Sequence, residues 1–396
     1  MFSWLGRPER SARDSVRTLS PGLAHEGPRR LFIHAGLHKT GTTALQAFLS
    51  SAADELRQFG VLYPRTGVNK QAGYGHHNIA WEMARDRRFM RAAGTIGELA
   101  IEVANFDGNV ILSSEDFETI IDDPDGFAPL RMHPGLSDRE FIFVVYVRNQ
   151  VAYAESLFLE LIHHGIGDEF ARFVRPVFHD QKIRLREWTY QFDYAHIYKQ
   201  WQDRSDARLI MRNYHQLDGG STVVDFINLV CPRVPQHALT HASQANPRRA
   251  LHNDISRFYQ NRVLRPLSRR EKATVRQLCV LLQGKPLVLS EYSREQLAAL
   301  FRNKNEMFSA MSGVSADRLQ DPPPSPAGAL QIEALFSFKL QNLIAENWRE
   351  DDIKAFVRDL EGPPPGAPPG IDPYRRDAPR AGSEARRLWP DPVQSA

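Results

Sequence analysis

A glycine-rich segment, GLHKTGTTALQ, contains the residue types that bind a phosphate-like group. Gly36 and Gly41 have the spacing of the nucleotide-binding P-loop, G-x-x-x-x-G-K-[ST], and Thr43 stands at its Ser/Thr position. Thr42 occupies the position of the P-loop lysine, however, and Lys39 lies two residues before Gly41. The P-loop lysine and a Mg²⁺ ion together bridge the several charges of a nucleoside triphosphate. A lysine inside the loop therefore indicates an anion that carries less charge.

The residues on either side predict the elements that position this loop. Residues 31–35 (LFIHA) form a short apolar run typical of a buried strand, and residues 42–50 (TTALQAFLS) have apolar side chains at helical spacing. The backbone N–H groups of a strand–turn–helix loop point at one spot, where the helix N-terminus adds partial positive charge. We expect an anion site at this point.

The rest of the first 230 residues alternates between strands and helices. Short β-branched runs predict strands at 61–63, 109–113, 141–147 and 207–211, and helices are predicted at 151–163 and 181–202. Continuous apolar strands of this kind are typical of a parallel sheet covered by helices on both faces. The predicted fold class is therefore α/β.

The segment Lys39-Thr40-Gly41-Thr42-Thr43 resembles the 5′-phosphosulfate loop of sulfotransferases, K-[ST]-G-T-[TS]. The longer phrase HAGLHKTGTTALQAFL is similar to the opening of a bacterial branch of that superfamily. The resemblance implies a P-loop-type fold and 3′-phosphoadenylyl sulfate (PAPS) as the sulfonate donor. It also implies that these five residues contact the donor and that Lys39 stabilises the leaving phosphate.

A second segment resembles the 3′-phosphate motif of the same superfamily, in which a buried strand precedes an arginine and a serine follows eight positions later. Here strand 141–147 leads into Arg148, and Ser156 is the eighth residue after it. The arginine offers a charged fork to a phosphate, and the serine adds a hydroxyl donor. Asn-Gln at 149–150 replaces the usual Asp-Pro, and His38 replaces a common proline before the lysine.

A third likeness carries no functional assignment. Residues 207–217 (ARLIMRNYHQL) are similar to a family strand that ends in a Tyr-Glu-Asp-Leu-type turn. His215-Gln216 replaces the acidic pair, and we expect Tyr214 to be structural. The resemblance as a whole extends over residues 31–230.

Sulfuryl transfer also needs a base for the proton of the acceptor, and two residues compete for this role. Glu115 follows the predicted strand 109–113, so we expect it at the same sheet edge as Lys39, and we prefer it. Its alternative role is that of a helix N-terminal carboxylate after an N-cap Ser114. The second candidate is His77, whose alternative role is that of a paired surface or core histidine.

The acceptor pocket is only weakly indicated. The predicted helix 181–202 contains aromatic residues that could stack on a sugar, although burial against the sheet is the preferred interpretation: Trp188, Tyr190, Phe192, Tyr194 and Tyr198. The basic stretch 248–272 could hold an anionic glycan, but a solvated helix face is preferred.

The bulk composition limits the remaining classes. The chain has 396 residues, 42% hydrophobic and 24% charged, and its net charge of +3 is too small to indicate nucleic acid. Cys231 and Cys279 give neither a disulfide framework nor metal-ligand spacing, which suits a reducing compartment. No secretory leader is recognised, and no run approaches the roughly 20 apolar residues of a membrane span. We therefore expect a cytoplasmic protein.

The domain organisation follows from composition. Residues 1–30 and 361–396 are rich in Pro, Arg and Gly and are predicted to be disordered. Residues 31–360 are predicted to form one α/β domain with a helical extension after about residue 230.

The sequence thus predicts a metal-independent, PAPS-dependent sulfotransferase. Its acceptor would be a hydroxyl of a carbohydrate, a glycolipid or a small molecule. One alternative is a P-loop kinase, in which strand 110–112 with Glu115 or Asp116 would form a Walker B element that holds Mg²⁺. The other alternative is a non-catalytic module that binds PAP or a nucleotide.

Overall fold

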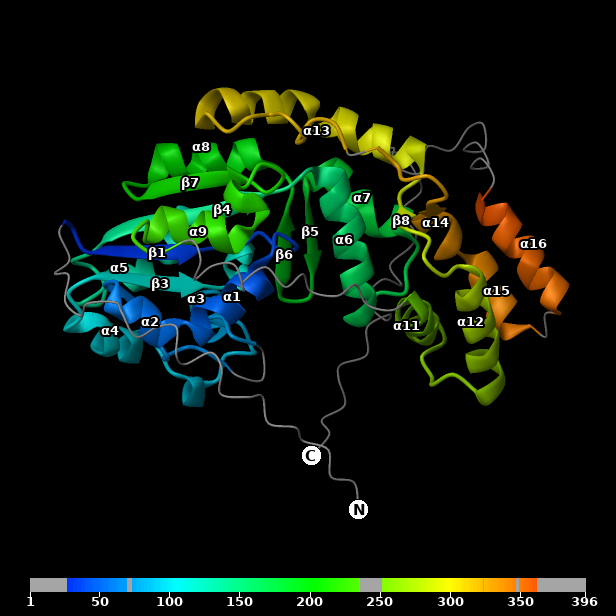
Figure 1. Ribbon diagram of the computed structural model, residues 1–396, viewed down its shortest axis with the longest axis horizontal. Helices are drawn as coiled ribbons and strands as arrows, with labels where there is room; N and C mark the ends of the chain where they lie inside the picture. The colour runs from blue at the N-terminus through cyan, green and yellow to red at the C-terminus, as the bar shows by residue number, and fades with distance from the viewer. Residues whose placement is uncertain (1–26, 70–72, 236–250, 323, 347–348, 362–396) are drawn as a thin grey trace, which may run out of the picture.

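The computed structural model of the chain describes residues 27–69, 73–235, 251–322, 324–346 and 349–361 (Figure 1). Its centre is a five-stranded sheet with the order β2-β3-β1-β4-β7, and all of its pairs are parallel. The strands are β1 (Arg30–His34), β2 (Val61–Leu62), β3 (Asn109–Ser113), β4 (Glu140–Val147) and β7 (Arg208–Asn213). The predicted strands are confirmed with small shifts at their ends. Because the pairing is parallel, their carboxyl ends share one edge.

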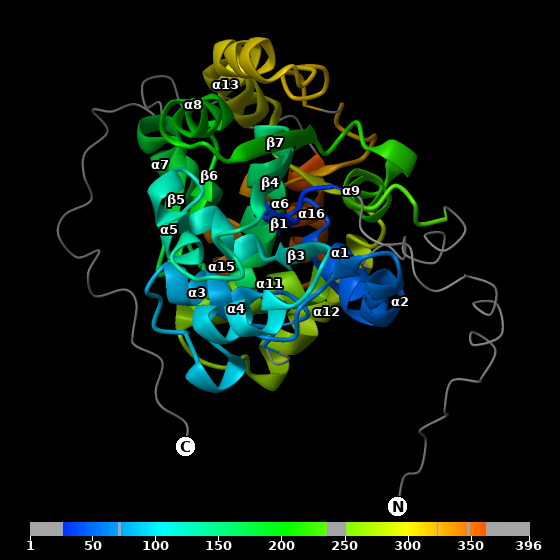
Figure 2. The same cartoon turned by 90° about the vertical axis from the view of Figure 1, so that its left-hand side faces the viewer.

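Helices cover both faces of this sheet, as predicted (Figure 2). One face carries α1 (Thr42–Ser51), α2 (Ala53–Gln58) and α9 (Thr222–Val230). The other carries α3 (His77–Met83), α4 (Ile96–Ala104), α5 (Ala128–Arg131) and α8 (Tyr194–Arg204). Strand β1 shows why both faces are apolar, because Leu31 and Ile33 pack in one core and Phe32 packs in the other.

A third core joins the middle of the chain to its C-terminal helices. It lies beside α6 (Gln150–His163) and α7 (Phe170–Asp180), where Phe158 contacts Phe336 and Phe258 contacts the same ring. The C-terminal helices are α11 (Leu251–Val263), α12 (Arg269–Leu281), α13 (Glu291–Ser312), α14 (Ile332–Leu335), α15 (Phe338–Ala345) and α16 (Glu350–Glu361). Two short strands, β8 (Leu287–Val288) and β9 (Leu330–Gln331), pair between them.

Buried amides also tie this helical extension to the start of α6. Gln150 and Asn305 exchange hydrogen bonds of 2.8 and 3.1 Å, and the Asn149 amide donates to the Leu319 carbonyl at 2.8 Å. Figure 1 shows α13 along the top of the molecule, next to α8. The helical extension therefore packs against the sheet domain and helps to fix the position of α6.

The predicted helix 181–202 is wrong over its first half. Residues there form an antiparallel hairpin, β5 (Lys182–Leu185) and β6 (Trp188–Gln191), and α8 starts only at Tyr194. Asp193 caps α8 by accepting from the His196 N–H at 3.0 Å. Burial of the aromatic residues is confirmed for Tyr190, Phe192 and Tyr194, which are at most 2% exposed.

Other boundaries also differ from expectation. The helical extension predicted after about residue 230 is interrupted at Ser337, whose backbone is extended, so α14 and α15 are separate helices. The segments predicted to be disordered lie almost entirely outside the described residues, although Arg30 already belongs to β1 and Glu361 ends α16. None of the helices in the described ranges is both long enough and apolar enough to cross a bilayer.

Candidate functional site

The glycine-rich loop lies at the carboxyl end of β1, between β1 and α1. The backbone N–H groups of Ala35 and Leu37 continue the pairing with β4 past the end of the strand, at 3.0 and 3.1 Å. Gly41 then turns the chain into α1 with a left-handed conformation (φ 86°). A Cβ atom at Gly41 would lie 2.7 Å from the Thr222 hydroxyl, so packing also requires glycine here.

The N-terminus of α1 is available to an anion. No side chain caps it, and its first turn contains no acidic residue. The first N–H groups of a helix lack intrahelical partners, and together with the helix dipole they attract negative charge. Thr43 is exposed in this first turn and Thr42 is buried. These features leave the N-terminus of α1 uncapped beside residues 39–43, where the sequence predicts an anion site.

Thr40 stabilises the loop from within. Its hydroxyl donates to the Leu37 carbonyl at 2.6 Å, and its own carbonyl accepts from the Thr222 hydroxyl at 2.8 Å. The Thr40 side chain is fully buried, so its hydroxyl holds the loop in shape.

Lys39 forms an ion pair with Glu160 of α6. Its Nζ lies 2.6 Å from Glu160 Oε2, and both side chains are about one-third exposed or less. Burial raises the pKa of the Glu160 carboxyl, but the charge and hydrogen bond of Lys39 outweigh burial and lower it overall. Glu160 is therefore a carboxylate that holds Lys39.

Arg148 joins the two predicted donor-binding motifs. Its Nη1 donates to Ser156 Oγ at 3.0 Å and to the Lys39 carbonyl at 2.9 Å. The guanidinium lies 5.5 Å from the centre of the Tyr214 ring, and the Tyr194 hydroxyl donates to the Arg148 carbonyl at 2.7 Å. The structure brings together Lys39, Arg148 and Ser156, as the sequence predicts.

Asn149 explains how this chain starts α6 without the Asp-Pro of the resembled motif. Its side-chain oxygen accepts from the N–H groups of Val151 and Ala152 at 3.0 and 3.2 Å, which is a helix N-cap. The cap places Ser156 in the second turn of α6, next to Arg148 at the carboxyl end of β4.

Glu115 lies against the loop, as expected. It begins a short 3₁₀ helix (Glu115–Thr119) after β3, and a Cβ atom at Gly36 would lie 3.4 Å from its Cα. Its Oε2 accepts from Gln46 of α1 at 2.6 Å. Ser114 is indeed the N-cap of this short helix and accepts from the Asp116 N–H at 3.1 Å. The position of Glu115 is therefore compatible both with a general base beside the loop and with a carboxylate at a helix N-terminus.

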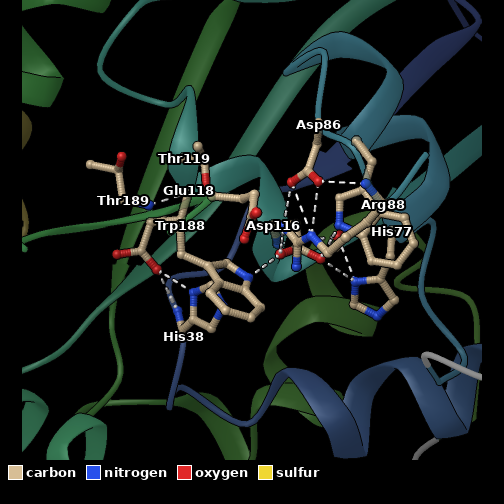
Figure 3. A network of polar contacts seen from close by, with 12 residues as sticks. His38, His77, Asp86, Arg88, Asp116, Glu118, Thr119, Trp188 and Thr189 are labelled. Carbon is tan, nitrogen blue, oxygen red and sulfur yellow. Dashed lines mark hydrogen bonds and ion pairs between the residues drawn. The ribbon is translucent and has the colours of Figure 1, made fainter. Parts of the chain in front are cut away.

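His77, the second candidate base, belongs to a separate network (Figure 3). Its Nδ1 lies 3.0 Å from Asp116 Oδ2 and 2.9 Å from Ser114 Oγ. Asp116 also accepts from the indole N–H groups of Trp81 and Trp188, at 2.9 and 2.8 Å. Asp116 thus orients His77 through one ring nitrogen, as in an Asp–His pair.

The charges in this network raise the pKa of His77 above its ordinary value. Burial lowers the pKa of His77, but the hydrogen bond to Asp116 and the charges of Glu115 and Asp116 raise it overall. Burial likewise raises the pKa of Asp116, whereas His77 and the Arg88 guanidinium lower it well below its usual range. His77 is only 5% exposed.

A buried ion pair between His38 and Glu118 fixes the loop from the other side (Figure 3). The backbone N–H and Nδ1 of His38 both contact Glu118 Oε2, at 2.8 and 2.7 Å. The Tyr153 hydroxyl and the Gln191 N–H donate to the other oxygen, both at 2.7 Å. Burial lowers the pKa of His38, but the bond and charge of Glu118 raise it to about 9. This pair connects the loop to α6 and to the hairpin.

The sequence did not single out Glu160 or Glu118, and it did not predict the hydrogen bond from Trp188 to Asp116. A signal existed for Glu160, because it lies four residues after Ser156 and so on the same face of α6. Glu118 and Trp188 gave no local signal, since hydrogen bonds to β6 and its hairpin place them here.

Among the residues that the structure describes, no group of three or more His, Cys, Asp or Glu side chains could hold a metal ion.

Comparisons with known proteins do not assign the chain to a family. No protein-family model matches the chain, and neither a curated protein nor a solved structure matches it. Function must therefore be inferred from the residues and their geometry.

Proposed function

We propose that the chain is a PAPS-dependent sulfotransferase with a P-loop-type fold, which transfers a sulfonate to a hydroxyl of a carbohydrate, glycolipid or small-molecule acceptor. The observation that supports this most is the position of Arg148. Its guanidinium contacts both Ser156 and the backbone of Lys39, so two anion-binding elements meet at one sheet edge. PAPS carries phosphate at both its 5′ and 3′ positions and requires two such elements. A nucleoside triphosphate has its phosphates in one chain.

The donor side of the reaction uses Lys39 and the N-terminus of α1. In the transfer, a bond forms between the acceptor oxygen and sulfur, and the bond from sulfur to the bridging oxygen of PAPS breaks. Negative charge then develops on the 5′-phosphate of the leaving PAP. Lys39 and the unpaired N–H groups of α1 stabilise that charge. Glu160 holds Lys39 until the donor offers it a stronger anionic partner.

The acceptor proton goes to Glu115 in this proposal. Glu115 is partly exposed beside the loop, and the neighbouring Gln46 amide orients it. His77, the other candidate, is only 5% exposed, and its Nδ1 contacts Asp116 and Ser114. Asp116, one of the two carboxylates that could hold Mg²⁺ in the kinase alternative, already accepts hydrogen bonds on both oxygens.

Thermal shift and transfer assays test the proposal. We expect PAP to raise the Tm more than ATP with Mg²⁺ does, because a ligand of the native state stabilises it. Arg148→Ala should weaken PAP binding by about 1.5–3 kcal/mol and Ser156→Ala by about 1 kcal/mol. Adenosine 5′-phosphosulfate, which lacks the 3′-phosphate, should bind either variant with almost unchanged affinity.

The exposed Arg270, which takes part in no ion pair among the described residues, provides the control as Arg270→Ala. A larger Tm increase with ATP and Mg²⁺ would select the kinase alternative. Tight PAP binding without PAP formation from PAPS, over a panel of sugars, glycolipids and small alcohols, would select the non-catalytic module. Equal losses for both nucleotides would show that Arg148 supports the fold and does not bind the 3′-phosphate.

A further inference from the structure

A basic groove lies beyond the end of α6, outside the donor site. It has a volume of about 690 Å³ and is bounded by α6, α11 and α12. We define the basic groove by the residues that line it: His163, His252, Asn253, Ser256, Arg257, Gln260, Leu267, Lys272 and Arg276. Figure 1 shows α11 next to the lower end of α6 and α12 on the far side of α11.

The charges of the groove are of one sign. Arg257 extends from α11, and Lys272 and Arg276 extend from one face of α12 at i, i+4 spacing. None of these three cations takes part in an ion pair within the described ranges. The two nearby carboxylates are already engaged, because Asp254 accepts from His163 at 2.6 Å and Glu271 bonds Arg265 and Tyr259. The groove therefore attracts an anion.

The neutral residues of the groove indicate what else the ligand contains. Asn253, Ser256 and Gln260 are hydrogen-bonding side chains, whereas Leu267 is the only aliphatic lining residue. Amide and hydroxyl groups of this kind bind sugar hydroxyls, and a single aliphatic side chain gives little surface for a steroid or a phenol. A volume of this size holds a ligand of a few sugar rings.

Helix α6 aligns this groove with the donor site. Ser156, Glu160 and His163 lie at i, i+4 and i+7, so they form one stripe along the helix. Ser156 contacts Arg148, Glu160 contacts Lys39, and His163 lines the groove. At about 1.5 Å per residue, His163 is only about 5 Å along the axis from Glu160. The groove thus lies next to the proposed donor site, along the same stripe of α6.

The position of the groove is set by buried hydrogen bonds. The Asn261 amide donates to the carbonyls of Ile162 and Ile166 at 2.6 and 2.8 Å. These contacts hold α11 against the C-terminal end of α6, so the spacing between groove and donor site is fixed.

We propose that the basic groove binds the anionic sugar units of an acidic oligosaccharide acceptor, next to the hydroxyl that receives the sulfonate. The proposal rests on the sulfotransferase function and specifies its acceptor class. The three cations bind carboxylate or sulfate groups of the chain, and the neutral side chains bind its hydroxyls.

Direct binding measurements on the full chain without donor test the groove alone. The probes are a tetrameric galacturonate, a sulfated tetrasaccharide, neutral maltotetraose and a single-stranded DNA oligonucleotide of matched charge. We expect an acidic tetrasaccharide to bind and maltotetraose not to bind. The double variant Lys272→Ala/Arg276→Ala should lose about a hundredfold in affinity, roughly tenfold for each charge-assisted contact. Arg270→Ala, on another face of α12, should change it less than about twofold.

The outcomes separate the groove from the proposed reaction. Unchanged affinity in the double variant, an equal loss in Arg270→Ala, or equally tight DNA binding that displaces the saccharide would overturn the groove as a saccharide site. The PAP thermal shift should be the same in the double variant and the wild type, which also reports folding. A groove that binds the acidic saccharide in a protein that PAP does not stabilise would retain the binding site and reject the sulfotransferase function.

Discussion

We define the donor edge as Lys39, Arg148, Ser156 and the loop between β1 and α1. The donor edge and the basic groove both contain cationic side chains, but these differ in whether partners within the protein already bind them. At the donor edge Lys39 pairs with Glu160 and Arg148 donates to Ser156 and to a backbone carbonyl. In the groove, the cationic side chains are exposed and join no ion pair formed within the described residues.

The difference shows two ways of using positive charge. A cation held by internal partners is oriented before the ligand arrives, which favours chemistry at a defined atom, although it must exchange one partner for another. An exposed cation on a long side chain adds affinity with little orientation, and salt screens it readily. A change at Lys39 should therefore lower kcat, and changes in the groove should raise KM for the acceptor.

The largest expected effect is that of Glu115→Gln. This change preserves size and some hydrogen bonding to Gln46 but removes the proton acceptor. We expect kcat to fall by about a hundredfold to ten-thousandfold. PAP affinity measured by calorimetry should stay near that of the wild type. His77→Asn is the matched control, and a severe loss of rate there with Glu115→Gln near full activity would give the proton to His77.

Lys39→Ala comes next and tests whether an internally paired lysine serves the leaving group. We expect kcat to fall by roughly a hundredfold or more, with a smaller loss of PAP affinity, because the charge on the leaving phosphate develops in the transition state. Single-turnover kinetics with PAPS measure this. Unchanged turnover would show that the donor edge does not depend on its lysine.

The His38–Glu118 pair predicts a pH-dependent stability of the loop. The folded pKa of His38, about 9, lies above its ordinary value of 6.5. The stabilisation is therefore complete below pH 6.5 and is lost as the pH rises through 9; it is worth at most about 3 kcal/mol. Urea unfolding of the wild type and of His38→Gln, from pH 6 to 9.5, should show the difference in unfolding free energy shrinking with pH. A constant difference would contradict a charged pair.

The smallest effect is expected for Glu160→Gln, which removes the internal ion-pair partner of Lys39. Without the carboxylate, Lys39 no longer has to break an ion pair before it binds the donor, so PAP should bind more tightly. The gain should be at most about fivefold, because a partly exposed ion pair contributes less than about 1 kcal/mol. Calorimetric titration with PAP at low and high salt measures it. Weaker PAP binding in this variant would mean that Glu160 positions Lys39 for the donor.

The sequence by itself determined the central strands and the position of the two motifs to which we assign donor binding. The β1–loop–α1 segment and the Arg148–Ser156 pair are each contained in one short stretch, so apolar periodicity and glycine spacing place their residues without knowledge of the fold. Parallel pairing then brings the two stretches to one edge, because β1 and β4 are neighbours.

Only the tertiary structure decided what surrounds them. Alternating aromatic residues at 188, 190 and 192 fit a strand, yet they were assigned to a helix because α8 continues the apolar pattern. The Glu118 contacts to His38 and Gln191 join positions 80 and 73 residues apart, and such pairs depend on topology. The basic stretch at 248–272 was expected to be a solvated face, and most of its described arginine and lysine side chains are exposed. Helical spacing shows which residues share a face, but packing alone decides which helix lies opposite, and the basic groove exists only because α11 and α12 meet the end of α6.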